Sequence, residues 1–495
     1  MERRDAVKTV RVRLDGAGGM PMPEKVLKSV YVSGMDFEPD ERRMRICPDG
    51  TVELQVEQTP YMVHAKITVP LYGQLWVMAD NQGEGYQSDF VDFVTEAIRT
   101  YVSWARKFGE GIQLSVETKA HLDAAIEFEH LANRGMDTPD NRLYALSHAM
   151  FAAEEALLEK ARNLVHPRSD LRLGCNFTRF TSPTARYAGF FAKAFDFATL
   201  PFYPGRTVPS QGVYDYSYVD RALSFLLEKG ITPKGHPLFF GHREVNPQWM
   251  FSLTYPELRR EAAAIARHHV ETYKGVIDIW DAMNEAHDWA NCFELSQDQL
   301  IDLTRATTDA LREGNDQAVS IVNVCLPFAE YVAGRYNCYG ALPEHLRSPL
   351  RYFRAILDAG VDFDVVGIQL YFPGRDMVAV SRMLDAYAAL GKPIHITEMG
   401  VNGGFRVKGN TGSSWSQLDM SEGTWHGGWN EHTQADWLEM FYTVAAARPE
   451  IQALTWWDFI EPSFSGNGAF LYEDENPREM YFRLLALKDR LVTKS

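Results

Sequence analysis

Residues 276–285 read Val-Ile-Asp-Ile-Trp-Asp-Ala-Met-Asn-Glu, an apolar run that ends on an amide and a carboxylate. Its Ile, Val and Trp residues are spaced as in a buried strand, and the residues that follow are typical of a loop. A buried parallel strand that stops on Asn284 and Glu285 places both side chains at the mouth of a sheet, where α/β barrels carry their chemistry. The dipeptide alone is weak evidence, because Asn430-Glu431 repeats it in a context that does not resemble a strand. It gains weight only if the chain supplies a second carboxylate in the same setting.

A second run of the same kind supplies that carboxylate. Residues 393–398 read Pro-Ile-His-Ile-Thr-Glu, a short β-branched segment that ends on Glu398. In a barrel the two runs would be the fourth and seventh strands, whose C-terminal ends face one another across the mouth. Glycoside hydrolysis requires two such carboxyl groups. One is protonated and donates its proton to the leaving oxygen, and the other is ionised and attacks or stabilises the anomeric carbon.

The rest of the chain from about residue 170 alternates apolar strand, polar loop and amphipathic helix. The eight predicted strands are Leu171–Phe177, Phe195–Leu200, Pro233–Phe240, Val276–Asn284, Val319–Cys325, Phe363–Tyr371, Pro393–Glu398 and Ile451–Phe459. The clearest predicted helices between them are Tyr218–Lys229, Pro256–Tyr273 and Asp376–Leu390. We therefore predict an α/β fold in which residues 170–495 form a (β/α)8 TIM barrel. A doubly wound open sheet is the alternative, but no glycine-rich phosphate loop follows any early strand.

The first 169 residues lack this alternation of strands and helices and are predicted to form two further regions. Residues 1–88 contain short alternating segments and a Pro-Asp-Gly turn, which is typical of a small antiparallel β-rich domain. Residues 89–169 carry apolar residues at three- and four-residue steps from Phe90 to Phe108 and continue with two more amphipathic segments. We interpret them as a helical connector. The β-rich domain could bind carbohydrate, but packing against the barrel is the favoured interpretation of its role.

Composition and charge exclude several classes of partner. The chain has 495 residues, of which 45% are hydrophobic and 12% aromatic, as in a globular protein with ample material for sugar-stacking surfaces. The formal charge of −16 would repel nucleic acids and acidic membranes, so neither partner is expected.

The cysteines and the hydropathy of the chain indicate which cellular compartment to expect. The five cysteines are odd in number and lack CxxC spacing, so we expect no disulfide framework and no zinc site. No apolar stretch follows the first eight residues, and no run of about eighteen apolar residues predicts a membrane span. We expect a cytoplasmic protein, or a secreted one if a signal segment has been trimmed from the sequence.

Several other predicted strand ends carry polar or aromatic side chains. His236 and His242 stand six residues apart at the end of the third strand, and Gln369 and Tyr371 lie on one side of the sixth. The eighth strand ends in tryptophans, the second of which is Trp457. A single histidine is more often structural than a ligand. The indication of a site is that several such strand ends fall on the same face of the barrel.

The motifs have a characteristic order along the chain. They are Trp280–Glu285, Gly235-His236 with His242, Gly367–Gln369, Ile396–Glu398, Thr455–Trp457, and Gly468–Tyr472 with Asn476-Pro477. Over about residues 170–490 this set resembles glycoside hydrolase family 10, the retaining endo-β-1,4-xylanase family. Each motif is only modestly specific, but several in the right order are strong evidence.

The resemblance implies a role for each matching residue. Glu285 would be the acid/base and Glu398 the nucleophile. Asn284 would bind the sugar 2-hydroxyl, and His236 would line the −1 subsite, which holds the sugar whose bond is cut. The expected substrate-binding residues are Asn284, His236, His242, Gln369 and Trp457, together with Tyr371 and Arg206, which stand at positions that depart from the family pattern.

The sequence departs from the family pattern in its sugar-binding shell. After the second strand the family carries a Glu-Asn…Lys segment that grips the −1 sugar, whereas residues 199–206 here read Thr-Leu-Pro-Phe-Tyr-Pro-Gly-Arg. Tyr371 stands where the family has a histidine beside the nucleophile, and Gly241 replaces a tryptophan. These changes weaken the expectation of xylan as substrate more than that of β-glycoside hydrolysis.

We therefore predict a retaining β-glycoside hydrolase that acts on a β-linked oligo- or polysaccharide without metal or cofactor. A xylan-type substrate is the best single expectation. The same mechanism on a glucoside, galactoside or uronic-acid glycan is the first alternative, and a non-catalytic carbohydrate-binding barrel is the second. The sequence leaves the sugar, the choice between exo and endo action and the oligomeric state open.

Overall fold

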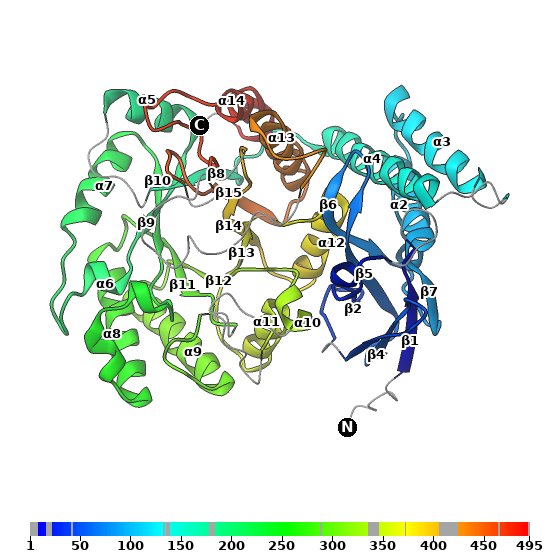
Figure 1. The fold of residues 1–495 in the computed structure, drawn as a ribbon. Coiled ribbons are helices and arrows are strands. Elements are labelled where there is room, and N and C mark those ends of the chain that lie inside the picture. Colours follow the sequence, from blue (N-terminus) through cyan, green and yellow to red (C-terminus); the bar gives the residue numbers. More distant parts are fainter. Residues whose placement is uncertain are drawn as a thin grey trace.

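The computed structural model describes residues 8–493 except 16–21, 41–42, 132–133, 135–138, 178–183, 288–289, 335–345, 372, 405–423 and 464–465. Figure 1 shows an α/β barrel with a β-rich region and three long helices packed beside it. The trailing part of the motif around Glu285, residues 288–289, lies outside the described residues. No helix among the residues described is both long and apolar enough to cross a membrane.

Eight parallel strands close into a barrel in the order β10-β11-β12-β13-β14-β15-β8-β9. They are β8 Arg172–Asn176, β9 Phe197–Pro201, β10 Thr232–His236, β11 Ile279–Asn284, β12 Val319–Val324, β13 Val365–Tyr371, β14 Ile394–Gly400 and β15 Ile451–Trp456. Each overlaps one of the eight predicted strands, so the predicted barrel is confirmed. Almost every strand residue is buried, as expected of parallel strands covered on both sides.

Helices follow the strands around the outside of the barrel (Figure 1). They are α5 Ala185–Ala194, α6 Pro204–Thr207, α7 Ser217–Glu228, α8 Tyr255–Thr272, α9 Gln297–Gly314, α10 Glu330–Gly334, α11 Pro349–Asp358, α12 Met377–Ala388, α13 Glu431–Ala446 and α14 Glu479–Leu491, with 3-10 turns η4 Arg243–Val245 and η5 Gln248–Ser252. Their starts are well capped: Thr254 and Glu257 form a capping box on α8. Asn430 caps α13 by accepting hydrogen bonds from the backbone of His432 and Thr433. This explains why the second Asn-Glu pair of the sequence belongs to no strand.

The N-terminal β-rich region consists of two small sheets, in the strand orders β3-β4-β1-β7 and β2-β5-β6. The strands are β1 Lys8–Arg13, β2 Tyr31–Gly34, β3 Met44–Ile46, β4 Val52–Val56, β5 Tyr61–Val69, β6 Gly73–Ala79 and β7 Phe90–Asp92, with helix α1 Glu24–Leu27 and turn η2 Asn81–Gly83. The pairing is antiparallel except between β1 and β7, which run parallel. Strand β7 lies beyond residue 88, so the described strand pairs within the predicted β-rich domain are all antiparallel.

Three helices follow: α2 Phe93–Gly109, α3 Val116–Leu131 and α4 Pro139–Leu164. The helical pattern assigned to residues 90–108 begins too early, because Phe90 lies in strand β7 and is 45% exposed. From Phe93 onward the apolar face is buried as expected, including Ala97 and Tyr101. The boundaries placed at residues 88 and 169 stay a prediction.

Polar contacts join the N-terminal regions to the barrel around α12. The Arg375 side chain is buried and donates to Tyr31 Oη at 2.5 Å and to Glu330 Oε1 at 3.0 Å. Tyr101 Oη donates to Asp376 Oδ2 at 2.5 Å. One continuous apolar cluster runs through the β-rich region, the three helices and the barrel. The N-terminal regions therefore share a core with the barrel, and their burial stabilises both.

Candidate active site

The two candidate catalytic carboxyl groups lie at the C-terminal ends of β11 and β14. Strand pairing is irregular beside both of them: the register shifts between Ile368 and Gln369, so that Gln369 pairs with Glu398 and one residue of β14 is skipped. A shift also occurs in β11 just before Asn284. Glu285, the first residue after β11, has a φ of 54°, a left-handed conformation that is uncommon for a residue with a side chain. Bulges and such backbone conformations are frequent at functional sites, where they re-aim a side chain.

Glu285 is buried among neutral hydrogen-bond donors. Its side chain is 5% exposed, and its Oε1 accepts from Gln369 Nε2 at 2.9 Å and more weakly from Asn284 Nδ2 at 3.4 Å. Burial raises the pKa of Glu285 to about 7, and hydrogen bonds from Gln369, Cys325 and Asn284 oppose the shift. A carboxyl group with this pKa retains its proton in much of the population at neutral pH.

Glu398 is equally buried but has groups around it that favour the anion. Tyr371 Oη donates to its Oε2 at 2.9 Å, and Asn323 Nδ2 donates to its Oε1 at 3.1 Å. Nε2 of His236 lies 3.7 Å from the same Oε1. Burial raises the pKa of Glu398 to about 7, an effect that His236 and Lys234 oppose and that the charge of Glu285 reinforces. Lys234 and His236 act on Glu398 and not on Glu285, so Glu398 is the one of the pair whose anion has cationic groups acting on it.

Side-chain amides link the two carboxyl groups. Gln369 Nε2, which donates to Glu285, also approaches Asn284 Oδ1 at 3.3 Å. Asn323 Nδ2 lies 2.7 Å from the same Asn284 oxygen and also donates to Glu398. Each amide thereby fixes the orientation of the next, so the two acidic side chains are held in one connected network.

A buried ion pair orients His236. Asp281 Oδ2 accepts from Lys234 Nζ at 2.7 Å and lies 2.6 Å from His236 Nδ1, and all three side chains are 0–1% exposed. Burial acts against the Asp281 anion, but Lys234 and His236 hold the pKa of Asp281 below its usual value. An ionised carboxylate can only accept, so Nδ1 of His236 carries the proton and Nε2 faces Glu398.

Aromatic rings flank His236 on the barrel mouth. Its ring makes edge contacts with Trp457 and with Tyr203, at centroid distances of 5.6 and 5.5 Å. Tyr203 follows β9, and its phenol pKa is raised by burial and by the charges of Glu398 and Glu285. Trp457, next to the end of β15, is 9% exposed.

The remaining two predicted site residues have their described contacts elsewhere. His242 accepts a hydrogen bond from the backbone of Glu244 at 3.2 Å and stacks on Phe240, and burial lowers its pKa to about 4. Arg206 is exposed on α6, with its guanidinium 4.3 Å from the centre of the Tyr218 ring. The roles predicted for these two residues stay predictions.

Several residues in or behind the site are not predicted from the sequence. Asn323, which contacts Glu398, lies in an apolar strand pattern, and so do Lys234 and Asp281, which support His236. The signal that was available is a polar or charged residue within a run that is otherwise fully buried, since such residues need partners on neighbouring strands. Tyr203 was considered only as a replacement for the polar sugar-binding segment of the family.

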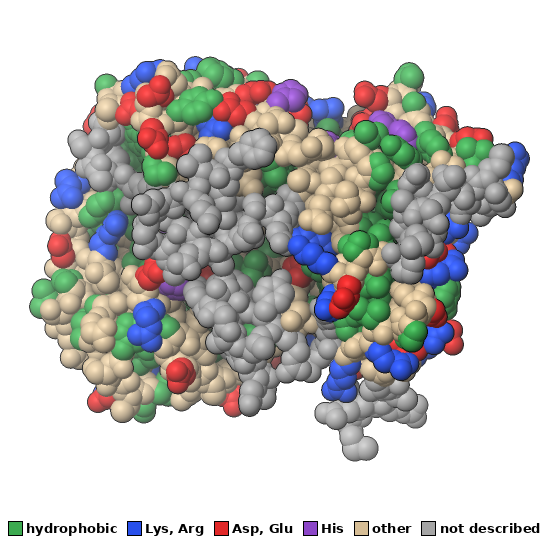
Figure 2. All heavy atoms as spheres, viewed as in Figure 1, with side chains coloured by type: hydrophobic (Ala, Val, Ile, Leu, Met, Phe, Trp, Pro, Cys, Tyr) green, Lys and Arg blue, Asp and Glu red, His purple; other side chains and the backbone are tan. Residues whose placement is uncertain are grey.

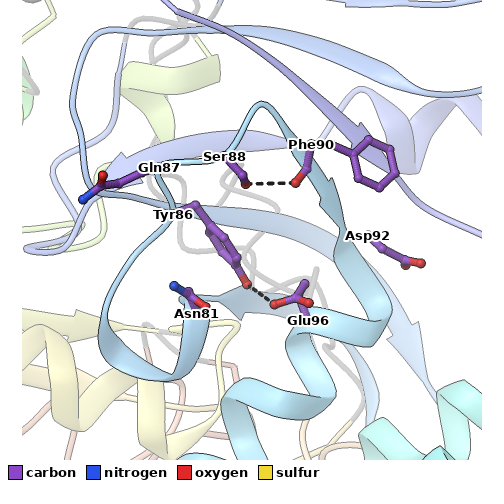
Figure 3. A pocket seen from close by; sticks show the side chains of 7 residues that line it. All are labelled: Asn81, Tyr86, Gln87, Ser88, Phe90, Asp92 and Glu96. Atoms are coloured by element: carbon purple, nitrogen blue, oxygen red, sulfur yellow. Dashed lines mark hydrogen bonds between the residues drawn. The ribbon is translucent and has the colours of Figure 1, made fainter.

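A separate pocket lies in the N-terminal region, away from the barrel strands (Figure 3). Its volume is about 380 Å³, and its lining residues are Asn81, Tyr86, Gln87, Ser88, Phe90, Asp92 and Glu96. Its polar groups already have protein partners: Tyr86 Oη donates to Glu96 at 3.1 Å, and Asp92 forms ion pairs with Arg13 and Arg142. We therefore place the chemistry at the barrel mouth.

Comparison with known proteins finds xylanases among those similar to this chain. "Endo-1,4-beta-xylanase B" of Thermotoga neapolitana is 24% identical over 306 residues, which cover 57% of this chain and 76% of the relative. "Endo-1,4-beta-xylanase A" of Caldicellulosiruptor saccharolyticus is 26% identical over 211 residues, 39% of this chain and 56% of the relative. Among solved structures, native xylanase 10B from Thermotoga maritima has 17% identity and a TM-score of 0.49, covering 67% of this chain and 98% of its own.

The family model extends across both carboxyl groups. The model of glycosyl hydrolase family 10 matches residues 202–485, which is more than half of the 495-residue chain. This range runs from the segment after β9 into α14 and contains Glu285 and Glu398. The resemblance drawn from the sequence motifs is thereby confirmed, and the chain belongs to glycosyl hydrolase family 10.

Proposed function

We propose that Glu285 and Glu398 hydrolyse a β-linked, xylan-type polysaccharide by double displacement with retention of configuration. The observation that carries the proposal is the unequal surroundings of two buried carboxyl groups, of which only Glu398 has cationic neighbours. Two acidic groups whose environments favour different protonation states are what a retaining glycosidase uses as acid and nucleophile.

In the first step Glu398 attacks the anomeric carbon. The bond between that carbon and the leaving oxygen breaks, and Glu285 transfers its proton to the oxygen, which leaves as the shortened glycan. The hydrogen bonds from Tyr371 and Asn323 hold the Glu398 carboxylate in position and stabilise its anionic form until the glycosyl ester forms.

In the second step Glu285, now ionised, accepts a proton from water while the water oxygen attacks the anomeric carbon. The ester bond to Glu398 breaks, and both carboxyl groups return to their starting states. Gln369 donates to Glu285 in the resting protein and is placed to stabilise its anionic form between the steps.

The choice of xylan rests on the relatives, whose names describe endo-1,4-β-xylanases. The chain differs from the family at the segment after β9, where Tyr203 lies beside His236 in place of a polar sugar ligand. An aromatic face offers stacking instead of hydrogen bonds, so we expect recognition of the −1 sugar to depend more on ring shape.

A trapping experiment tests the proposal. A 2-deoxy-2-fluoro-β-xylobioside with an activated leaving group slows the second step, so the glycosyl-enzyme accumulates and is visible by mass spectrometry. We expect one added disaccharide, mapped by peptide digestion to residue 398. An adduct on another residue would overturn the assignment. If neither this reagent nor the gluco and galacto analogues gives an adduct or turnover, the barrel is a carbohydrate-binding protein instead.

A further inference from the structure

Helices α3 and α4 bring together side chains that can bind a metal, outside the barrel. Glu117 and His121 stand four residues apart on α3 and so lie on one face of that helix. Glu155 projects from α4, which packs along α3 (Figure 1). One ligand atom of each of the three residues lies within 4.8 Å of the other two. Figure 2 shows histidine and acidic side chains on the surface where these helices meet.

We propose that Glu117, His121 and Glu155 form a binding site for a divalent transition-metal ion such as Zn²⁺. Two carboxylates and one imidazole are three of the four ligands that zinc takes in a tetrahedral site, with water completing the set. The imidazole favours zinc, nickel or cobalt over calcium and magnesium, which prefer oxygen ligands alone.

Neighbouring side chains hold the proposed ligands in place. Nδ1 of His121 lies 2.8 Å from Nδ1 of His148, and the His121 ring stacks on Phe151 at a centroid distance of 5.2 Å. When the Nδ1–H of His121 donates to His148, the lone pair of Nε2 is available to a metal, and an outer partner of this kind is usual for metal-binding histidines. Thr118 Oγ1 lies 3.1 Å from Glu155 Oε2 and 2.7 Å from Glu159 Oε1, so its single hydroxyl proton is shared between these two carboxylates of α4.

The electrostatics of the cluster favour a cation. Among the described residues, no lysine or arginine forms an ion pair with Glu117 or Glu155. A divalent ion would offset the repulsion between the carboxylates and cross-link α3 to α4.

This site would stabilise the fold without taking part in glycoside cleavage. Both helices precede the barrel strands in the chain, and neither contributes a residue to the network around Glu285 and Glu398. The cysteines lack the spacing of a zinc site, whereas Glu117 and Glu155 are 38 positions apart and belong to two different helices. The proposal is independent of the substrate and of the catalytic mechanism.

The test uses the full chain after chelation and exchange into metal-free buffer. Titration with ZnCl2 in a calorimeter should show one equivalent bound and a higher melting temperature. Co²⁺ should give visible absorption bands typical of nitrogen and oxygen coordination. His121→Ala and Glu155→Gln should abolish the binding and the bands. His148→Ala should weaken binding by about 10–100-fold, as expected for an outer partner of a metal-bound histidine.

Matched controls come from the same helix. His130→Ala and Glu127→Gln change exposed residues of α3 and should bind zinc as the original chain does. Zinc binding that survives in His121→Ala and Glu155→Gln, or that disappears in the controls, would place the ion elsewhere. The absence of stoichiometric binding to the original chain would also overturn the proposal. The activity of the metal-free chain below its melting temperature should be unchanged.

Discussion

The Tyr371 hydroxyl donates a hydrogen bond of 2.9 Å to Oε2 of Glu398. The phenol cannot ionise near neutral pH, since burial and the charge of Glu398 raise its pKa well above the usual value. It is therefore a permanent donor to the carboxylate, whereas a histidine in this place would change its role with pH. The bond stabilises the anionic form of Glu398, and this form is the nucleophile of our proposal.

Tyr371→Phe should lower kcat/KM and shift its pH dependence. The hydrogen bond lowers the pKa of Glu398, so its removal raises that pKa and moves the acid limb of the kcat/KM profile to higher pH. A hydrogen bond to a charged group contributes about 1.5–3 kcal/mol, or roughly a 10–100-fold loss of rate when it is removed. A pH profile with an unmoved acid limb would show that Tyr371 does not act on the nucleophile.

Gln369→Met should move the basic limb of the kcat/KM profile, whereas Tyr371→Phe moves the acid limb. Gln369 lowers the pKa of Glu285 by donating to its Oε1, so its loss raises that pKa and shifts the basic limb of the profile to higher pH. Methionine fills a similar volume without donating. Because the pKa values of both carboxyl groups are about 7, the original chain should show a narrow bell near neutral pH. Comparison of the two variants distinguishes the limbs, and equal shifts of both limbs in either variant would contradict the assignment.

The carboxyl pair should also reduce stability at alkaline pH. The ordinary pKa of a glutamate is 4.5, and the pKa of Glu285 in the fold is about 7. Between these values the folded state binds more protons than the unfolded state, so the free energy of unfolding falls as the pH rises through this range. Glu285→Gln removes the charge and should stabilise the protein at pH 8 by on the order of 2 kcal/mol.

Urea unfolding of Glu285→Gln at pH 5 and pH 8 is the measurement. The gain should be small at pH 5, where the original residue is also neutral. A gain of equal size at both pH values would mean that burial of the charge is not its source.

Asp281→Asn should destabilise the barrel, because it leaves the buried Lys234 ammonium without its counter-ion. The loss of one partner of a buried pair costs about 3–5 kcal/mol. Asp362→Asn is the matched control: its carboxylate pairs with Arg312 at 3.3 Å and is 70% exposed, so its loss should cost less than about 1 kcal/mol. Both values come from urea unfolding at pH 7, and equal losses would contradict the proposed importance of the Lys234–Asp281 pair.

The barrel was predictable because its signals are local. Each strand is a short buried run, and barrels carry their chemistry at C-terminal strand ends, which predicts that Glu285 and Glu398 lie close together. A strand such as β7 cannot be told from the start of a helix, since three residues carry too little periodicity to be recognised. The start of α2 was misplaced for the same reason, because Phe90 continues the apolar spacing of the helix.

Contacts between distant segments were not predictable from the sequence. Asn323 bridges Asn284 and Glu398 only because β12 lies next to β11 and close to β14 in the closed barrel. Tyr101 on α2 and Asp376 at the start of α12 are 275 positions apart and meet only in the folded chain. Such pairs follow from the register and tertiary packing, for which a single sequence gives no direct signal.

Azide rescue of alanine variants tests the central claim, the division of roles between the two carboxyl groups. With an aryl β-xylobioside whose leaving group departs without protonation, Glu285→Ala should still form the glycosyl-enzyme, whereas its hydrolysis slows because no base activates water. Added azide should restore turnover and yield a β-glycosyl azide, since two inversions give retention. Glu398→Ala should form no such intermediate and give no β-azide. Melting curves must show that both variants are folded. Exchanged azide responses, or two folded variants with the activity of the original chain, would contradict the account.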